Sequence, residues 1–453
     1  MRLRLRVLGT IFLIGSALPI SARSANHPSV ASQTSAETSV SAKCVECHSK
    51  ATPGPVADWK QSKHEGVGVG CDTCHGSEHM TAEDVAKAKI PTPETCGQCH
   101  QTQVEQFSKG KHAKAWVAME AMPTIHYQPM AMTEGMKGCG GCHKLGLKSP
   151  EQIATLAKEG SRFGIASCDA CHTRHTFSVA EARSPQACET CHMGFDHPQW
   201  QMYESSKHGV RSGLKQLNIQ SQNSVAPTCQ TCHMQNGDHE VHTAWGFLAL
   251  RLPMPEDKQW ADDRAAILMA LGVLDPTGKP TARLQAVKAA DIARLDQASW
   301  QTDRDKMLKT CNQCHSINFA RQQLEYGDDM IRNADHLMAD GIRTVAALYK
   351  DGLLPKPKNY AYAYPDLLTF HDAPTRIEQT LFVMFLEHRM RTFQGVFHSS
   401  PDYALWYGWS EMQRDLTDIK EQAGEIRRMG HAPAAVSIAP VKQSASEPPP
   451  VPR

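Results

Sequence analysis

The chain has 453 residues, which is enough for one large domain or two domains of ordinary size. Its 48 Lys and Arg residues almost balance its 47 Asp and Glu residues. This charge excludes the strongly basic composition typical of nucleic-acid-binding proteins, so we expect no nucleic-acid partner. The unusual feature of the composition is its sixteen cysteines.

The N-terminal 25 residues have the pattern of an export signal. Three arginines precede an apolar run at residues 7–20, and small residues follow it, with Ala22 and Ala25 as candidate cleavage positions. The apolar run is short for a membrane span, although an uncleaved anchor is the alternative interpretation. We therefore expect residues 1–25 to be a signal peptide, and the mature protein to be periplasmic without a stable membrane span.

All sixteen cysteines fall in one pattern, Cys-x-x-Cys-His, which occurs eight times. The cysteine pairs are Cys44/Cys47, Cys71/Cys74, Cys96/Cys99, Cys139/Cys142, Cys168/Cys171, Cys188/Cys191, Cys229/Cys232 and Cys311/Cys314. The histidines that follow them are His48, His75, His100, His143, His172, His192, His233 and His315. Two thiols at this spacing add to the two vinyl groups of one haem, and the adjacent histidine binds its iron. The sequence therefore predicts eight covalently bound haem c groups.

Three other uses of cysteine fit this pattern less well. Zinc ribbons use paired Cys-x-x-Cys, but tetrahedral zinc does not require a histidine directly after each second cysteine. Thioredoxin-like motifs occur singly, within an alternating β/α pattern that this sequence lacks. A disulfide framework would not repeat one motif eight times.

Fifteen of the 23 histidines lie outside these motifs and can supply second axial ligands. The preferred candidates follow a lysine, lie just beyond a haem motif, or precede a predicted helix: His64, His79, His112, His175, His197, His208 and His398. His242 and His336 are looser candidates. His27 and His431 lie near the two ends of the chain, where we expect surface histidines.

The chain between the ends divides into two regions after a Ser-, Ala- and Thr-rich linker at residues 26–42. In residues 43–318, short polar or Gly- and Pro-broken stretches separate the haem motifs. Such peptide cannot build a conventional core, so the haems must supply much of the buried apolar surface. We expect a mainly α multihaem cytochrome c with little sheet, a haem-packed N-terminal part and long C-terminal helices.

The second region, residues 319–430, contains apolar residues at helical spacing. Helices are predicted over about 319–351 and 376–397. A third begins at Ser400-Pro401-Asp402, which combines a capping hydroxyl, a proline in the first turn and an acid at the positive helix end. It runs to about Arg428. The Pro-rich end, residues 431–453, is expected to be a disordered tail.

Eight haem motifs followed by long helices resemble the octahaem hydroxylamine oxidoreductase family, over about residues 44–428. The resemblance also includes Cys-His-Thr-Arg-His-Thr-Phe-Ser around His175, Asp-His-Pro-Gln-Trp around His197, Cys-His-Met-Gln-Asn-Gly-Asp-His-Glu-Val at 232–241 and Phe-Gln-Gly-Val-Phe-His-Ser-Ser-Pro-Asp-Tyr at 393–403. Octahaem tetrathionate reductases and one octahaem nitrite reductase group use lysine at the catalytic motif. Because all eight motifs here end in histidine, both are disfavoured.

The resemblance implies that the fourth haem, on Cys139, Cys142 and His143, is a modified catalytic haem with an open distal face. The other seven haems would each have two histidine ligands. The family places an acid and a histidine above the catalytic iron, and Asp238 and His239 match that description. The alternative is that His239 binds another haem iron.

Oxidising members of the family also carry a tyrosine from a neighbouring subunit, covalently joined to the catalytic haem. Tyr403 is the candidate, and Tyr407 lies four residues further on and is the alternative. An ordinary packed aromatic explains either tyrosine as well. A tyrosine that crosses between subunits implies a homotrimer.

The function that the resemblance implies is oxidation of hydroxylamine to nitric oxide or nitrite. Electrons would leave through the seven bis-histidine haems to an external c-type cytochrome. An ammonia-forming nitrite or hydroxylamine reductase and a hydrazine oxidase are alternatives on the same fold. A multihaem electron carrier without a substrate is the alternative from another class.

Overall fold

The computed structural model describes residues 40–120, 139–158, 167–194, 196–246, 248–250, 254–289, 296–356, 363–368 and 373–430. Within these ranges the chain is mainly helical, and one isolated β-bridge, between Leu274 and Pro280, is its only extended pairing. The predicted mainly α class is therefore confirmed. The expected signal peptide and C-terminal tail lie outside the described residues, and the first helix begins at Val40, inside the expected linker.

The helices before residue 240 are short. They are α1 (Val40–Ala51), α2 (Pro53–Lys60), α3 (Lys63–Gly66), α4 (Cys71–His75), α5 (Pro93–Gly97), α6 (Gln101–Lys109), α7 (Ala115–Glu120), α9 (Cys139–His143), α10 (Pro150–Lys158), α11 (Val179–Ala182), α12 (Gln186–Glu189), α13 (Gln199–Ser205), α14 (Lys207–Gln216) and α15 (Cys229–His233). Short 3₁₀ turns, η1 (Ala82–Lys87), η2 (His112–Lys114), η3 (Cys168–Ala170) and η4 (Gln235–Gly237), connect them. Several haem motifs are themselves single helical turns, as in α4, α9 and α15.

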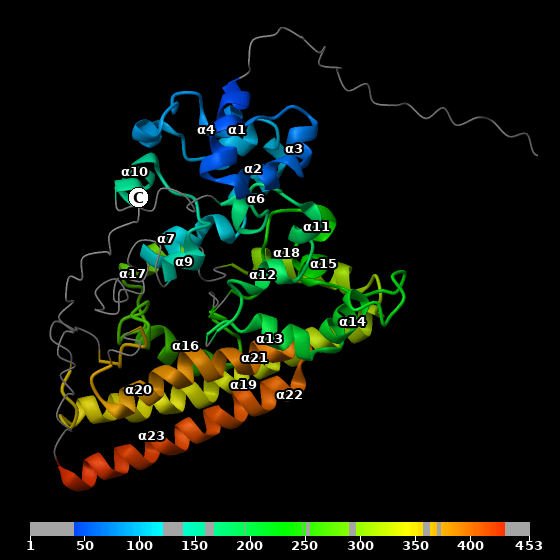
Figure 1. Ribbon diagram of the computed structural model, residues 1–453. Helices are drawn as coiled ribbons and strands as arrows, with labels where there is room; N and C mark the ends of the chain where they lie inside the picture. Colours follow the sequence, from blue (N-terminus) through cyan, green and yellow to red (C-terminus); the bar gives the residue numbers. More distant parts are fainter. Residues whose placement is uncertain are drawn as a thin grey trace, which may run out of the picture.

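The longest described helices, α19 (Ile317–Lys350) and α23 (Ser410–Met429), lie in the later part of the chain. The other helices of this part are α16 (Lys258–Ala270), α17 (Arg283–Ala289), α18 (Gln297–Cys311), α20 (Arg376–Val383), η6 (Met384–His388), α21 (Arg389–Phe397), α22 (Pro401–Tyr403) and η7 (Ala404–Trp409). Figure 1 shows α19, α20–α21 and α23 lying side by side in one layer, with the motif-bearing part on top of them. The expected long C-terminal helices are therefore present.

The conventional hydrophobic core belongs to this helical layer. Its main cluster runs from Trp245 to Ile426, and α19 contributes a fully buried stripe that includes Ile331, Met338 and Ile342. Before residue 245, the described part of the chain buries only a few hydrophobic side chains: Val56, Ala88, Ala113, Trp116, Leu156 and Met202. This imbalance agrees with the expectation that the polypeptide of the motif-bearing part does not build a core by itself.

Two of the predicted helices contain a π-helical segment. The helix expected over 376–397 is divided into α20, the π-helical η6 and α21, and η7 follows α22 in the same way. Glycine permits the close contact between α21 and η7, because a Cβ on Gly408 would lie 2.5 Å from the backbone nitrogen of Thr392. Helix α23 ends where Gly430 adopts a left-handed conformation with φ of 62°.

A buried ion-pair network joins α16, α19 and α21. Asp335 of α19 is fully buried, and its carboxylate accepts hydrogen bonds from Arg264 of α16 and Arg389 of α21. The two guanidinium groups also donate to the carbonyls of Ala249 and Leu248. The network therefore fixes the segment before residue 251 against the helical layer.

Candidate haem and catalytic sites

Seven of the eight motif histidines face a second histidine. Their ring centres lie 6.0 to 6.4 Å apart in the pairs His48–His79, His75–His175, His100–His64, His172–His239, His192–His112, His233–His398 and His315–His208. An imidazole nitrogen lies about 2 Å from a bound metal ion and its ring centre about 1 Å further, so two imidazoles on opposite sides of one iron have centres about 6 Å apart. The observed spacing fits one iron between the two rings of each pair.

Local helix signals explain how two of the paired histidines are presented. Ser62 caps α3 and accepts a hydrogen bond from the backbone of Glu65, which places His64 in the first turn. Ser206 caps α14 in the same way and places His208 at the same position. The recurrent Ser-Lys-His sequence is therefore a capped helix start that carries a histidine.

Hydrogen bonds at Nδ1 orient several of these imidazoles. Nδ1 of His75 donates to the carbonyl of Lys89 at 3.1 Å, and Nδ1 of His398 donates to the carbonyl of Gln394 at 2.8 Å. A proton held on Nδ1 leaves Nε2 free to bind a metal. Burial also lowers the pKa of His233 to about 3, which keeps its imidazole neutral, as a ligand must be.

The cysteines behave as the haem interpretation requires. The fifteen whose side chains are described form no disulfide with one another. In addition, the buried Nδ1 of His239 has no hydrogen-bond partner among the described residues, which is unusual for a buried polar atom and is compatible with a ring held by iron. The donor set and its spacing therefore fit covalently held haem.

Three of the predicted attachment cysteines are exposed at the protein surface. Cys47, Cys99 and Cys314, the second cysteines of the first, third and eighth motifs, are exposed, whereas the other twelve described cysteines are partly buried.

The physical reason is that little polypeptide covers these three motifs. Helix α1, which carries Cys47, and helix α6, which begins two residues after Cys99, bury none of their side chains. Cys314 lies just beyond the end of α18, between exposed neighbours. Thioether attachment depends on the spacing of the two thiols and not on their burial, so all three remain predicted attachment residues.

The fourth motif differs from the other seven. His143 lies in α9, and its Nδ1 donates to the carbonyl of Ala115 at 2.7 Å. Within the described part of the chain, no second histidine ring faces it at the spacing of the seven pairs. Burial is the largest cause of the lowered pKa of His143, and His197 and Asp196 lie close enough to influence it. His143 in turn contributes to the lowered pKa of His112, after burial.

Asp196 and His197 form a hydrogen-bonded pair through Asp196 Oδ1 and His197 Nδ1. Burial alone would lower the pKa of His197, but the hydrogen bond and the charge of Asp196 outweigh it and raise the pKa above the ordinary histidine value. Both side chains are partly accessible, at 31% for His197 and 19% for Asp196. This pair can take up and release a proton next to the fourth motif.

The structure places the two Asp-His pairs differently from the sequence-based expectation. Asp238 and His239 were expected above the fourth motif, but the ring of His239 lies 6.2 Å from His172 of the fifth motif. Asp238 instead lies 3.4 Å from Nζ of Lys306. His197, expected as an axial ligand, is hydrogen-bonded to Asp196, and its ring centre lies 6.2 Å from that of His192 of the sixth motif, within the spacing range of the seven pairs. The physical reason is that an Asp-His dipeptide can serve either role, and tertiary folding places residues 196–197 near His192 and close enough to His143 to influence its pKa.

The other candidate histidines fall into two groups, those that face a motif histidine and those that pair with an acid. His64, His79, His112, His175, His208 and His398 each face a motif histidine, and so does His197, which faces His192; their binding to iron stays a prediction. His242 lies 3.3 Å from Glu240, and His336 lies 2.9 Å from Asp263. The side chain of Cys139 lies outside the described residues.

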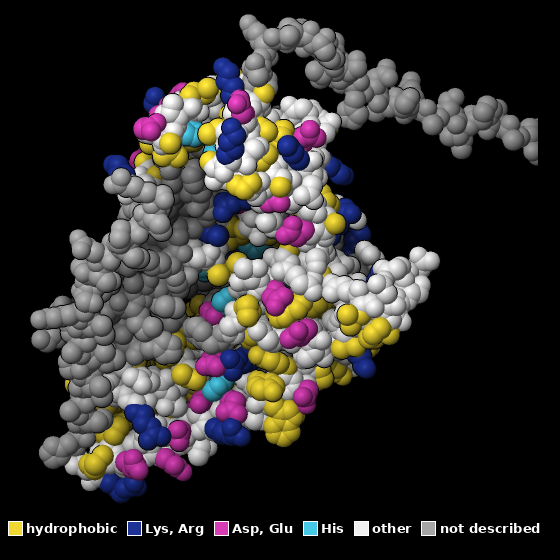
Figure 2. All heavy atoms as spheres, viewed as in Figure 1, with side chains coloured by type: hydrophobic (Ala, Val, Ile, Leu, Met, Phe, Trp, Pro, Cys, Tyr) yellow, Lys and Arg dark blue, Asp and Glu magenta, His cyan; other side chains and the backbone are white. Residues whose placement is uncertain are grey.

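Tyr403 and Tyr407 stack on the outer face of α22 and η7, with ring centres 4.9 Å apart. Tyr407 is 55% exposed and its neighbour Trp406 is 58% exposed. Figure 2 shows hydrophobic side chains gathered at this end of the helical layer. No described contact joins Tyr403 to the fourth motif within one chain.

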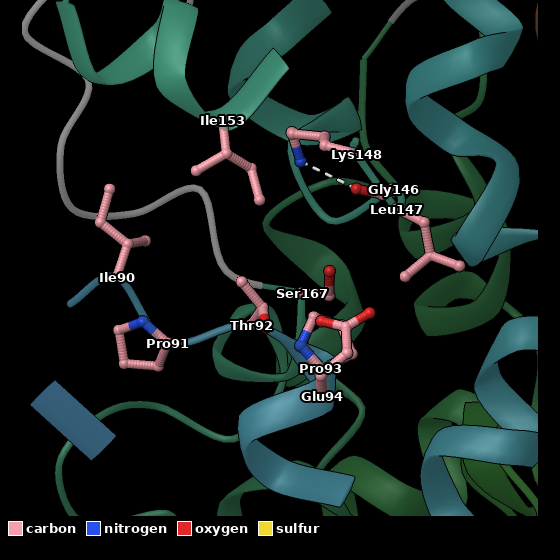
Figure 3. Close-up of a pocket in the computed structure, with 10 residues that line it drawn as sticks. All are labelled: Ile90, Pro91, Thr92, Pro93, Glu94, Gly146, Leu147, Lys148, Ile153 and Ser167. Atoms are coloured by element: carbon pink, nitrogen blue, oxygen red, sulfur yellow. Dashed lines mark hydrogen bonds between the residues drawn. The ribbon is translucent and has the colours of Figure 1, made fainter. Parts of the chain in front are cut away.

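A small cavity beside the fourth motif is lined by Ile90, Ile153, Ser167 and Lys148, among others (Figure 3). Nζ of Lys148 donates to the carbonyl of Gly146 at 2.8 Å, and burial lowers the pKa of this lysine to about 8. The volume of about 20 Å³ holds a single water molecule, so this cavity is too small for a cofactor.

Comparisons with known proteins agree with this geometry. Residues 41–264 and 281–360 match the family described as "Seven times multi-haem cytochrome CxxCH". A probable nitrite reductase-hydroxylamine oxidoreductase fusion protein of Kuenenia stuttgartiensis is 25% identical over 480 residues, covering 85% of this chain and 52% of the relative. The chain thus spans about half the length of that relative.

Two solved structures share the fold. One is a reducing hydroxylamine-oxidoreductase-like (HAO-like) protein complex of Kuenenia stuttgartiensis, with 24% identity, a TM-score of 0.60 and 85% of both chains covered. The other is a hypothetical multihaem protein, with 20% identity, a TM-score of 0.61, and 85% of this chain and 95% of that chain covered. At these identities the likeness shows the fold alone.

Proposed function

This chain belongs to the Cys-x-x-Cys-His multihaem cytochrome family, and from that premise we propose that it is a periplasmic octahaem oxidoreductase that oxidises hydroxylamine. One observation carries the proposal. Seven motif histidines face a second histidine, whereas His143 of the fourth motif lies beside the Asp196–His197 pair. Seven sites are therefore built to carry electrons, and one is built to hold a substrate.

The substrate chemistry suits the Asp196–His197 pair. Oxidation of hydroxylamine to nitric oxide releases three protons together with three electrons. Cys139, Cys142 and His143 would hold a haem at the fourth motif, and that haem would supply an iron for substrate binding and electron uptake. His197 accepts protons, and Asp196 fixes its ring and stabilises the charge that it gains.

The seven histidine pairs carry the electrons away. Two histidine ligands hold an iron six-coordinate in both oxidation states, which suits electron transfer rather than substrate binding. An external c-type cytochrome is the proposed acceptor. No helix among the described residues is long and apolar enough to cross a bilayer.

The direction of catalysis depends on Tyr403 in this proposal. The exposed side chains of Trp406 and Tyr407 and the partly buried Tyr403 would meet a second copy of the chain in a homotrimer, and Tyr403 would bond to that copy's fourth haem. Tyr407 is the alternative partner. Mass spectrometry of the proteolysed holoprotein tests this point: a peptide containing Cys142, one haem and Tyr403 supports oxidation.

The second candidate is reduction of nitrite or hydroxylamine to ammonia on the same scaffold. It is favoured by the relative named a nitrite reductase-hydroxylamine oxidoreductase fusion and by the fold shared with the reducing HAO-like complex. A haem held only by the two cysteines of the fourth motif would favour this candidate. Hydroxylamine, hydrazine and nitrite should be tested side by side on the same preparation.

The site assignment is tested with variants of the two Asp-His pairs. His197→Gln and Asp196→Asn should lower the turnover of hydroxylamine by roughly 100-fold or more, because positioned proton transfer contributes about that much. Asp238→Asn is the matched comparison and should cause a far smaller loss. A large loss in Asp238→Asn with normal turnover in Asp196→Asn would return the catalytic role to Asp238.

A further inference from the structure

We propose that Gln199 is a positioning residue that sets the reduction potential of the haem held by Cys188, Cys191 and His192, and that Gln394 holds Gln199 in place. This role is separate from the identity of the substrate. It rests only on the assignment of His192 as an axial ligand, which the pairing with His112 supports.

The geometry is a short chain of hydrogen bonds between two helices. Gln199 is the first residue of α13, and its Oε1 lies 3.2 Å from Nδ1 of His192. Its Nε2 lies 2.9 Å from Oε1 of Gln394, in α21. Gln394 is 6% exposed, so water does not compete strongly for these groups.

The direction of each hydrogen bond follows from the metal site. Nε2 of His192 must present a lone pair to iron, so Nδ1 carries the proton and donates it. Gln199 must then accept with Oε1, which turns its Nε2 towards Gln394. The amide of Gln199 is therefore held at both ends in one orientation.

A hydrogen bond at this position acts on the iron through the imidazole. A better acceptor at Nδ1 makes the imidazole a stronger electron donor, which stabilises the more positive oxidised iron and lowers the reduction potential. His75 and His143 donate instead to main-chain carbonyls, which a substitution cannot remove. At the sixth motif the acceptor is a part-buried side chain, whereas the side-chain partner of His48 at the first motif, Thr52, is exposed. A side-chain acceptor makes the potential of the sixth haem adjustable by mutation.

Gln394 also connects this site to the seventh motif. Its main-chain carbonyl accepts the Nδ1 hydrogen of His398 at 2.8 Å, and His398 faces His233. One residue of α21 therefore supports an axial ligand at two neighbouring sites, through its side chain at one and its main chain at the other.

The test is a spectroelectrochemical titration of the full-length holoprotein and its variants. Gln199→Met keeps the side-chain length but removes the acceptor, and should raise the potential of one of the eight haems. Gln199→Glu supplies a stronger acceptor and should lower it. We expect a change on the order of tenfold in the equilibrium between the two oxidation states, which corresponds to roughly 59 mV for one electron.

Gln201→Met is the matched control, because Gln201 lies in the same helix and its buried Oε1 makes no hydrogen bond among the described residues. Its titration should overlay that of the unmodified protein. Low-temperature electron paramagnetic resonance of the oxidised protein should show one low-spin signal displaced in the Gln199 variants only.

Opposite shifts for Gln199→Met and Gln199→Glu, each confined to about one eighth of the absorbance change, support the proposal. Equal shifts in the same direction, or shifts no larger than in Gln201→Met, overturn it. Gln394→Met gives an independent check if a Gln199 variant does not fold, and should shift the potential of the same haem upwards. These measurements do not depend on turnover. They can therefore refute the role of Gln199 while the catalytic assignment stands.

Discussion

Replacing Asp335 with Asn tests whether the buried ion-pair network stabilises the helical layer. Asp335 is fully buried and accepts hydrogen bonds from Nη2 of Arg389 at 2.7 Å and from Nε1 of Trp260 at 2.8 Å, in addition to its bond with Arg264. Arg264 and Arg389 are at most 1% exposed. The substitution keeps the size of the side chain but leaves both guanidinium groups without their carboxylate.

Removing one partner from a buried pair typically costs about 3–5 kcal/mol, so we expect Asp335→Asn to lower the free energy of unfolding by about 4 kcal/mol. The pH dependence has a definite sign. Burial alone would raise the pKa of Asp335, but the charges of Arg264 and Arg389 outweigh it and lower the pKa below 3.8. The stabilisation is therefore present above about pH 3.8 and is lost as the pH falls through the lowered value.

The assay is denaturant-induced unfolding of the holoprotein, followed by circular dichroism and by haem absorbance at neutral pH. Asp340→Asn is the matched control on the same helix, because Asp340 pairs with Lys420 at 2.8 Å and both side chains are about half exposed. An exposed pair contributes about 1 kcal/mol or less, so the control should unfold close to the unmodified protein. If both variants unfolded at the same denaturant concentration, the reasoning about Asp335 would be wrong.

Two further predictions follow from the buried groups. His239→Gly removes the ring that faces His172, so the reduced variant should bind one additional carbon monoxide per chain, and added imidazole should reverse this; unchanged binding would contradict the ligand assignment. Burial raises the pKa of Glu378 above 4.5, so the stability that its protonated form contributes is fully present below about pH 4.5 and is lost as the pH rises through the raised value. Glu378→Gln should flatten that part of the curve of unfolding free energy against pH, and an unaltered curve would show that Glu378 does not titrate there.

Local signals in the sequence predicted much of the fold and most of the paired histidines. A Ser-Lys-His segment contains its own helix cap, so the presentation of His64 and His208 depends on a few adjacent residues. Helix α19 could likewise be predicted, because its apolar residues recur at helical spacing within one continuous segment. The π-helical segments were not predicted, because one extra residue per turn hardly changes the apolar pattern over twenty residues.

The exposure of individual motif cysteines was also beyond the reach of local signals. The motif spacing is the same at Cys47, Cys99 and Cys314 as at the partly buried cysteines. Which motifs lie at the surface depends on how the short helices pack together, and the spacing of the thiols carries no information about that packing.

The proposed catalytic pair, Asp196 and His197, could not be chosen from local signals. Residues 196–197 and 238–239 both read Asp-His, and each follows a haem motif by a few residues. Only the path of the chain between α12 and α13 brings the first pair to His143, while the second lies against His172. The partners of Asp335 were equally hidden, because Arg264 is 71 residues away in the sequence and Arg389 is 54 residues away.

The most direct test of a single substrate-binding iron is a titration of the fully reduced, native holoprotein with carbon monoxide. In the proposed assignment, the seven histidine pairs would hold their irons six-coordinate and exclude the ligand, whereas the fourth site would bind it. We predict one carbon monoxide per chain, or one for every eight haems. No binding would contradict the account and indicate a pure electron carrier, and two or more per chain would contradict the assignment of the histidine pairs.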